Sequence, residues 1–383
     1  MDTIYLDNNA TSQVAPEVTE AMLPFFTTYY GNPSSMYRFG GEVAKHVAQA
    51  RAKIAHLFHA APEEILITSS GTEADNTAIW SAIQTQPEKR HIVTSCVEHP
   101  AILNTLAFWE QQGYRVTKLG VDTKGRIDLD EYAKALTPDT ALVTIMYANN
   151  ETGTLFPIEA MATLAKERGI LFHTDAVQAA GKVPIDLSRL PVDMLSLSGH
   201  KLHAPKGIGC LYVRKGLVFR PFLRGGHQEN GRRGSTENVP YIVGLGLACS
   251  MAEDAMDDEK RVAILRDTLE QGLLERIPQS QVNGDIEHRL ANTTNISFKN
   301  VEGEAILLML DRAGICASSG SACTSGSLEP SHVLRAMQVP FACAHGSIRL
   351  SLSRYTTAEE IEKTLAVFPD IIATLRKLSP FKE

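Results

Sequence analysis

The sequence lacks the features that mark several large classes of protein. Its net charge is −7 and it has no basic tract, so it offers no electrostatic footprint for nucleic acid or for an anionic membrane surface. No stretch is apolar for long enough to span a bilayer, and the opening MDTIYLDNNATS has no basic segment followed by an apolar one. We therefore expect a soluble cytoplasmic protein with small-molecule or protein partners, no nucleic acid and no membrane.

Cysteine is scarce and scattered. The six cysteines form no CxxC pair and lie at Cys96, Cys210, Cys249, Cys316, Cys323 and Cys343. This pattern excludes a secreted disulfide framework, disfavours a zinc site and predicts reduced thiols, most of which pack structurally. Cys323 differs because SSGSACTSGSLEP (318–330) surrounds it with serine and glycine in place of apolar neighbours. We expect an exposed, mobile loop carrying a reactive thiol, and no metal.

The order of short β-rich and helical runs predicts the fold class. From Pro16 to about Val213 the two kinds of run alternate, as in EILITSS followed by GTEADNTAIWSAI, which is typical of an α/β fold with a mostly parallel sheet. After the glycine-rich segment 223–239 the pattern becomes a long helical region and then mixed strands and helices. We predict a large domain over 14–255 and a smaller α+β domain formed by 1–13 and 256–383, which carries the cysteine loop.

Apolar residues at helical spacing predict two early helices, and an acidic run marks the later helical region. The first helix is expected to bury Val18, Met22, Phe25 and Tyr29, and the second Val43, Val47, Ile54 and Leu57. The run EDAMDDEKR (253–261) is expected to be a solvated helix face or a linker.

Polar residues follow four predicted strands, where ligands collect in an open α/β sheet. Gly71 and Thr72 begin a helix and can hold a phosphate through free N–H groups. The same residues would also be found at an ordinary helix N-cap that binds no ligand. Asp175 can pair with a cationic ring nitrogen or cap a helix, and His99 can stack on a ring, move a proton or pack structurally. Lys201 follows MLSLSGH; most lysines are solvated, but one held in a pocket can form a Schiff base.

These four features together meet the needs of one cofactor. A phosphate cradle, a carboxylate for a ring nitrogen, a stacking histidine and a Schiff-base lysine are the groups that serve pyridoxal 5'-phosphate, which acts as an electron sink. The conjunction is far more specific than any single member. It predicts a pyridoxal-phosphate site at the mouth of the sheet.

The motifs SGHK, HTDAVQA, EHPA, NNETG and SSGSACTSG together resemble the cysteine desulfurases, pyridoxal-phosphate enzymes of the class V aminotransferase group with the type I transferase fold. The resemblance runs from YLDNNATS through GNPSS and RRGSTENV to SIRLSLSRYT, and ANNETGTLFPIE and GHKLHAPKG are most similar to the nitrogen-fixation (NifS) type. Two positions depart from the family pattern. Ser235 stands where glycine is common, and Tyr37 where histidine is frequent.

The resemblance implies a role for each matching residue. Lys201 would form the Schiff base and move the substrate α-proton, and His99 would stack on the ring and take part in proton transfer. Asp175 would pair with the ring nitrogen and Gln178 with the ring oxygen. The phosphate would be held by Gly71, Thr72, Ser198 and His200, with Thr236 reaching over from the second subunit of a homodimer. The substrate carboxylate would bind Asn150 and Arg349, and the nucleophile would be Cys323.

The implied reaction removes sulfur from L-cysteine, giving L-alanine and a persulfide on Cys323 that passes to an iron–sulfur scaffold protein, with nitrogenase as the destination. One alternative keeps the fold and changes the reaction, to a selenocysteine lyase or an aminotransferase. Another is a non-enzymatic sulfur or metal carrier that uses Cys316, Cys323 and Cys343, whose spacing resembles no common zinc or iron–sulfur site.

Overall fold

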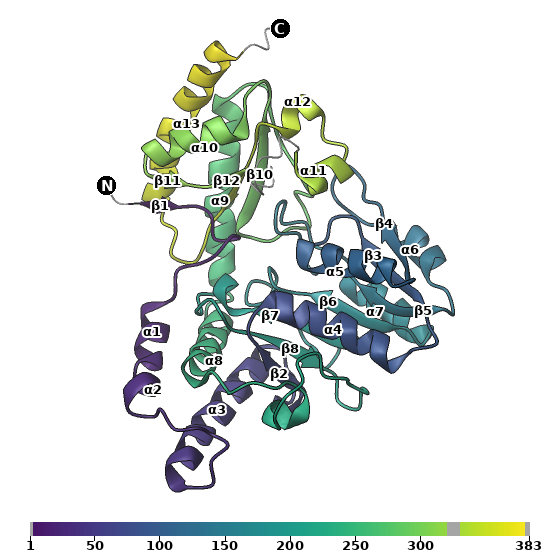
Figure 1. Cartoon of the computed structure of the whole chain (residues 1–383). Helices are drawn as coiled ribbons and strands as arrows, with labels where there is room; N and C mark the ends of the chain where they lie inside the picture. The colour runs from purple at the N-terminus through teal and green to yellow at the C-terminus, as the bar shows by residue number, and fades with distance from the viewer. Residues whose placement is uncertain (1–2, 320–329, 380–383) are drawn as a thin grey trace.

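The computed structural model describes residues 3–319 and 330–379, and places them around a seven-stranded sheet and a smaller four-stranded sheet (Figure 1). The large sheet has the order β2-β8-β7-β6-β5-β3-β4. Its strands are β2 (Ile65–Thr68), β3 (His91–Ser95), β4 (Arg115–Leu119), β5 (Thr140–Thr144), β6 (Leu171–Asp175), β7 (Met194–Ser198) and β8 (Gly209–Val213). All neighbours pair in parallel except β8, which runs antiparallel to β2 and β7. The predicted α/β class with a mostly parallel sheet is confirmed.

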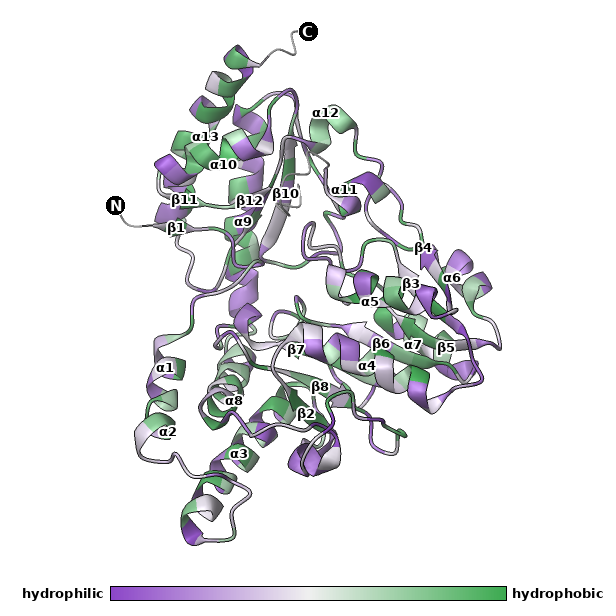
Figure 2. Ribbon diagram, in the orientation of Figure 1, coloured by the Kyte–Doolittle hydropathy of each residue, from purple (hydrophilic) through white to green (hydrophobic). Residues whose placement is uncertain are grey.

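Helices cover both faces of this sheet because its strands are apolar on both sides. In Figure 2, strands β2, β5 and β8 are coloured largely as hydrophobic. One face packs against α4 (Gly71–Thr85) and α5 (Pro100–Gln111) through a cluster that includes Ile79 and Leu106. The other face packs against α1 (Pro16–Met22), α3 (Arg38–Leu57), α7 (Ile158–Glu167) and α8 (Val239–Asp254). The result is a three-layer sandwich in which the helices leave a cavity at the carboxyl ends of the parallel strands.

The smaller sheet is antiparallel and has the order β12-β13-β10-β9. Its strands are β9 (Ser280–Val282), β10 (Thr293–Phe298), β12 (Ser318–Ser319) and β13 (Ser347–Ser351). A separate apolar cluster joins it to α9 (Asp258–Arg276), α10 (Gly303–Arg312) and α13 (Ala358–Leu378). Ile4 and Leu6 belong to this cluster, and β1 (Ile4–Tyr5) pairs in parallel with β11 (Ile315–Cys316). The N-terminal residues therefore pack with the C-terminal part, while the exact domain boundaries stay a prediction.

Short helices complete the described chain: α2 (Pro24–Thr27), α6 (Leu129–Ala135), α11 (His332–Ala336) and α12 (Phe341–Ala344), with 3₁₀ turns at Pro62–Glu64, Gly199–Lys201 and Gln228–Gly231. No helix in the described ranges is long and apolar enough to cross a membrane.

The first early helix differs from the expectation. It is two helices, α1 and α2, because Pro24 begins a new helix and cannot donate the N–H that α1 would need to continue. Val18, Met22 and Phe25 are buried as expected, but Tyr29 lies beyond α2 and is 36% exposed. The second helix is confirmed as α3, which buries all four predicted residues. The acidic run spans the end of α8, a short connection and the start of α9.

Candidate active site

A cavity of about 460 Å³ opens at the carboxyl ends of the large sheet's parallel strands, the place where ligands bind in open α/β folds. Its lining comes from segments far apart in sequence: the N-terminal stretch, the start of α4, the turns after β3, β5, β6 and β7, and strand β13 of the smaller sheet. The residues are Asn9, Ala10, Ser70, Gly71, Thr72, Asp75, His99, Met146, Ala148, Asn150, Asp175, Val177, Gln178, Ser198, His200, Lys201 and Arg349. Every predicted cofactor or substrate residue except Thr236 lies in this set.

Lys201 ends the 3₁₀ turn that follows β7, and its side chain is held in the cavity wall. Its Nζ donates to the carbonyl oxygens of Asn9 and Ala10, both at 2.6 Å. Burial, with a smaller contribution from the positive charge of Arg349, lowers the pKa of Lys201 to about 7. A lysine amine with this pKa is substantially neutral at physiological pH and can act as a nucleophile or a base.

Asp175 and Gln178 lie on the turn after β6. Asp175 is buried at the strand end, and its Oδ1 accepts the Val177 N–H at 2.9 Å, so it stabilises the turn without capping a helix. Burial raises the pKa of Asp175 to about 6, which makes a cationic partner favourable. The amide of Gln178 donates to the Asn9 carbonyl at 3.0 Å, while its Oε1 is buried with no partner among the described residues. An orphaned polar atom facing the cavity calls for a polar ligand.

His99 is the N-cap of α5. Its Nδ1 accepts the Ala101 N–H at 3.1 Å, so the proton of the neutral ring sits on Nε2. Burial lowers the pKa of His99 to about 4, with a smaller contribution from the charge of Lys201. The ring is therefore a neutral aromatic group at pH 7, with one N–H available for a hydrogen bond.

The start of α4 forms the end of the cavity suited to an anion. Ser70 is the N-cap and accepts the Glu73 N–H at 3.1 Å, so the hydroxyl of Thr72 is not needed as a cap. A Cβ on Gly71 would lie 2.7 Å from Val177 Cγ2 and 3.2 Å from Ser198 Cβ, so only glycine lets the helix approach this turn so closely. His200 is neutral because burial lowers its pKa to about 4. Free helix N–H groups and hydroxyls are the usual ligands of a phosphate.

Arg349 reaches the opposite wall from β13. Its Nη2 donates to Asp7 Oδ1 at 2.7 Å and its Nη1 to the Asn150 carbonyl at 3.0 Å. Its Nε is buried without a partner among the described residues, and its side chain is 10% exposed. A guanidinium with a free edge in a cavity suits a carboxylate.

Sequence reasoning missed several residues that shape this cavity. Asn9 supplies a carbonyl to both Lys201 and Gln178, and its own side chain is fixed by Asn150, Thr293 and Asn292. Asp75 lies on the buried face of α4 at helical spacing with Ile79 and Ala82. An acidic residue on an otherwise apolar helix face could have identified it from the sequence. Burial, with a smaller contribution from the charge of Asp175, raises the pKa of Asp75 well above its usual range.

Cys323 lies outside the described residues. Thr236 is exposed, in the segment between β8 and α8, and does not line this subunit's cavity. The other five cysteines are free thiols, and none of them lines the cavity; Cys210 and Cys249 are buried. Burial raises the pKa of Cys210 to about 12.

The cavity fits pyridoxal phosphate on the evidence of its unmet groups. Gln178 Oε1 and Arg349 Nε are both buried without a hydrogen-bond partner among the described residues, and both residues line the same space. The same lining contains a helix N-terminus, a guanidinium, a lysine amine and a carboxyl. A ring with a phosphate arm and an attached amino acid offers complementary groups to each.

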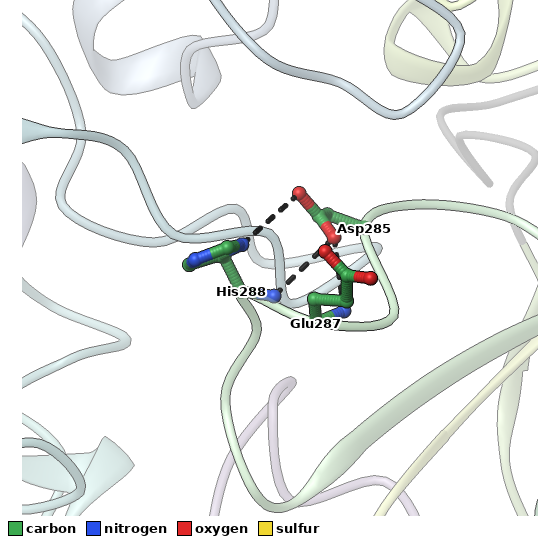
Figure 3. A group of neighbouring side chains, drawn as sticks. All are labelled: Asp285, Glu287 and His288. Carbon is green, nitrogen blue, oxygen red and sulfur yellow. Dashed lines mark hydrogen bonds and ion pairs between the residues drawn. The ribbon is translucent and has the colours of Figure 1, made fainter.

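Two other surface features contribute nothing to this site. A hollow of about 890 Å³ at the outer edge of the sheet, between β4 and α6, contains the exposed Arg126–Asp122 ion pair. Within the described ranges, one group of three candidate metal ligands exists: Asp285, Glu287 and His288 on a surface turn (Figure 3). Arg126 lies 4.0 Å from Asp285 Oδ2, which disfavours a cation there, and the group contains no cysteine.

Comparisons with known proteins extend over the whole chain. The family described as aminotransferase class V matches residues 4–364. A protein of Nostoc sp. named cysteine desulfurase is 61% identical over 100% of this chain and 96% of its own length, and the cysteine desulfurase NifS of Azotobacter vinelandii is 57% identical over 100% and 95%. The solved structure of a NifS-like protein has a TM-score of 0.92 and 38% identity over 97% of this chain and 100% of that one. SspA in complex with cysteine has a TM-score of 0.81 and 35% identity over 93% and 100%.

Proposed function

This chain belongs to the class V aminotransferase family, and we propose that it is a cysteine desulfurase that takes sulfur from L-cysteine, releases L-alanine and passes the sulfur on as a persulfide. Full-length similarity to two proteins named cysteine desulfurase supports the reaction. The observation that carries the chemistry is the convergence of Lys201, Asp175 and Arg349 on one cavity.

Pyridoxal phosphate is the cofactor we propose for this cavity, and when bound it supplies an electrophilic carbonyl and an electron sink for the pair released at the substrate α-carbon. Asp175 would hold the ring nitrogen protonated, since its buried carboxylate gains from a cationic partner. Gln178 would bind the ring oxygen, and the neutral imidazole of His99 would lie on the ring face. The phosphate would bind the start of α4 at Gly71 and Thr72, with Ser198 and His200.

Lys201 would hold the cofactor covalently and, once displaced by substrate, remove the substrate α-proton. Its amine is suited to both tasks because its pKa, lowered by burial to about 7, leaves a large neutral fraction at physiological pH. The carbonyls of Asn9 and Ala10 hold Nζ in place. Arg349 would bind the substrate carboxylate, and Asn150, whose carbonyl already orients the guanidinium, would complete that site.

Cys323 would accept the sulfur. Its thiolate would form a bond to the substrate sulfur while the Cβ–S bond of the substrate breaks, and the carbon fragment would take up one proton at Cβ, regain the α-proton from Lys201 and leave as L-alanine. An ordinary thiol with a pKa of about 8.5 is a few per cent thiolate at pH 7, a loss that an effective concentration of ~10⁵ M in the cavity outweighs. The persulfide would then pass to an iron–sulfur scaffold protein; the resemblance to the nitrogen-fixation type supports nitrogenase as the destination.

We also propose that the enzyme is a homodimer acting in the cytoplasm, where thiols stay reduced. Two features support a second copy of this chain as a partner. Thr236 is exposed and outside its own cavity, as a residue serving the other subunit would be. Large apolar side chains are exposed around α1, α2 and the turn before α3, including Leu23, Phe26 and Tyr30 at 58%, 54% and 71%.

The test mixes the purified protein anaerobically with L-cysteine and a thiol reductant, in parallel with Cys323→Ala, while the visible spectrum, alanine and sulfide are recorded. We expect equal alanine and sulfide from the parent, and from the variant a spectral change with almost no product. If both proteins respond alike in spectrum and product, the persulfide mechanism is wrong. A keto-acid requirement would instead indicate transamination.

A further inference from the structure

Glu73 places a carboxylate in the first turn of α4, directly after Thr72. Its oxygens accept the Ser69 N–H and hydroxyl at 2.8 and 2.5 Å, and both the Nε and Nη2 of Arg233 at 2.6 and 3.0 Å. Burial alone would raise the pKa of Glu73, but the hydrogen bonds from Arg233 and Ser69 outweigh it and lower the pKa. Glu73 is therefore a fixed negative charge, with its side chain 9% exposed.

A carboxylate in this position opposes the proposed phosphate, because both would lie at the same helix end. The two acids near the start of α4 lie on different sides of the helix and are treated differently. Burial, with a smaller contribution from the charge of Asp175, raises the pKa of Asp75. Glu73 keeps its charge and is balanced by the bidentate guanidinium of Arg233, whose side chain is 16% exposed.

Arg233 also belongs to the segment that carries Thr236, which lies three residues further along. A second bidentate ion pair holds the same segment: Glu229 accepts from Arg51 at 2.6 and 2.8 Å and from the Ile67 N–H at 3.1 Å. Backbone packing tightens it, since a Cβ on Gly234 would lie 2.7 Å from the Gly225 backbone. The two ion pairs thus fix one segment at two points, one on the first turn of α4 through Glu73 and one on α3 and β2 through Glu229.

We propose that Arg233 is a positioning residue for the cofactor phosphate, acting through Glu73: it cancels the one charged carboxylate in the first turn of α4 and ties the segment carrying Thr236 to that helix end. The inference rests on the proposed pyridoxal-phosphate site. Arg233 itself need not touch the cofactor. Its effect is selective, because only a ligand with a phosphate group meets the charge of Glu73.

The experiment measures the dissociation constants of pyridoxal phosphate and of pyridoxal, which lacks the phosphate, for the cofactor-depleted full-length protein by visible absorbance. Arg233→Gln leaves Glu73 unbalanced, and we expect about tenfold or more weaker binding of pyridoxal phosphate with pyridoxal changed less than about twofold. Arg233→Lys keeps the charge and should stay within about threefold of the parent for both. The double variant Glu73→Gln/Arg233→Gln removes both charges and should recover most of the lost affinity.

Glu229→Gln is the matched control, because it breaks the other buried ion pair of the same segment, which involves no residue of α4. We expect it to leave the ratio of the two dissociation constants unchanged. Equal weakening of both ligands by Arg233→Gln, or no recovery in the double variant, would show that the pair is only structural and overturn the inference. If the parent binds neither compound, the proposed cofactor site is wrong instead.

Discussion

Replacing Arg349 with glutamine tests how the enzyme selects an amino-acid substrate. The guanidinium is held by Asp7 Oδ1 at 2.7 Å and the Asn150 carbonyl at 3.0 Å, and its Nε is buried without a partner among the described residues. It is thus oriented before substrate arrives, with donor capacity left for one carboxylate. Glutamine at this position retains polarity but loses the charge and the fork of donors.

The magnitude follows from the charge-assisted hydrogen bonds that would be lost, which are worth about 1.5–3 kcal/mol. At about 1.4 kcal/mol per tenfold change, kcat/KM for L-cysteine should fall roughly 10- to 150-fold. Cysteamine has the same thiol and amine without the carboxylate, so its kcat/KM should change by less than about threefold. The assay measures sulfide release from both substrates by the parent and by Arg349→Gln.

Arg289→Gln is the matched control, since Arg289 is also a buried arginine in an ion pair, with Glu270, but lies outside the cavity. It should leave the ratio of L-cysteine to cysteamine unchanged even if it destabilises the fold. A parallel loss of both substrates in Arg349→Gln would refute the reasoning, because it would mean that Arg349 only supports the fold through Asp7 and Asn150.

Two further predictions concern stability. Burial lowers the pKa of His173 to about 3, against about 6.5 in an unfolded chain, so the unfolded state binds the proton first as pH falls. The contribution of neutral His173 to the free energy of unfolding is complete above about pH 6.5 and is lost toward pH 3 at up to ~1.4 kcal/mol per pH unit. Urea unfolding at pH values from 7.5 to 5 should therefore show that the free energy of unfolding falls less steeply with pH in His173→Gln than in the parent. An equal pH dependence in the two proteins would contradict this. Ser235 has φ of 126°, a conformation that favours glycine, so Ser235→Gly should raise the free energy of unfolding by about 1 kcal/mol while Ser235→Ala gains nothing. Thermal unfolding of the parent and the two variants measures this difference. An equal gain in the free energy of unfolding for Ser235→Gly and Ser235→Ala would exclude backbone strain as the cause.

The strain at Ser235 also accounts for one of the two departures from the family pattern. Glycine adopts that φ without a steric penalty, whereas serine adopts it here in a segment that two ion pairs hold at Glu229 and Arg233. The other departure, Tyr37, is the N-cap of α3 and is 59% exposed, away from the cavity lining.

Local sequence patterns specify which segments become strands and helices, and hence the order of the α/β layers. Alternation of β-rich and helical runs is a local property, and so is the position of a polar residue directly after a strand. That is why local patterns suffice to locate Asp175, Lys201 and His99 at the mouth of the sheet. The break at Pro24 was also readable locally, but the apolar spacing across it outweighed the proline in the prediction.

Which of these residues meet, and how their pKa values shift, depends on the packing of the folded chain. Asn9, Asp75 and Arg349 come from three distant parts of the chain, and their convergence depends on how β13 and the N-terminal stretch pack against the large sheet. The surroundings then shift the pKa of each group: burial raises the pKa of Asp75, while the hydrogen bonds from Arg233 and Ser69 lower the pKa of Glu73 on the same helix. No local pattern contains this information, because desolvation and ion pairing depend on what surrounds a side chain after the chain has folded.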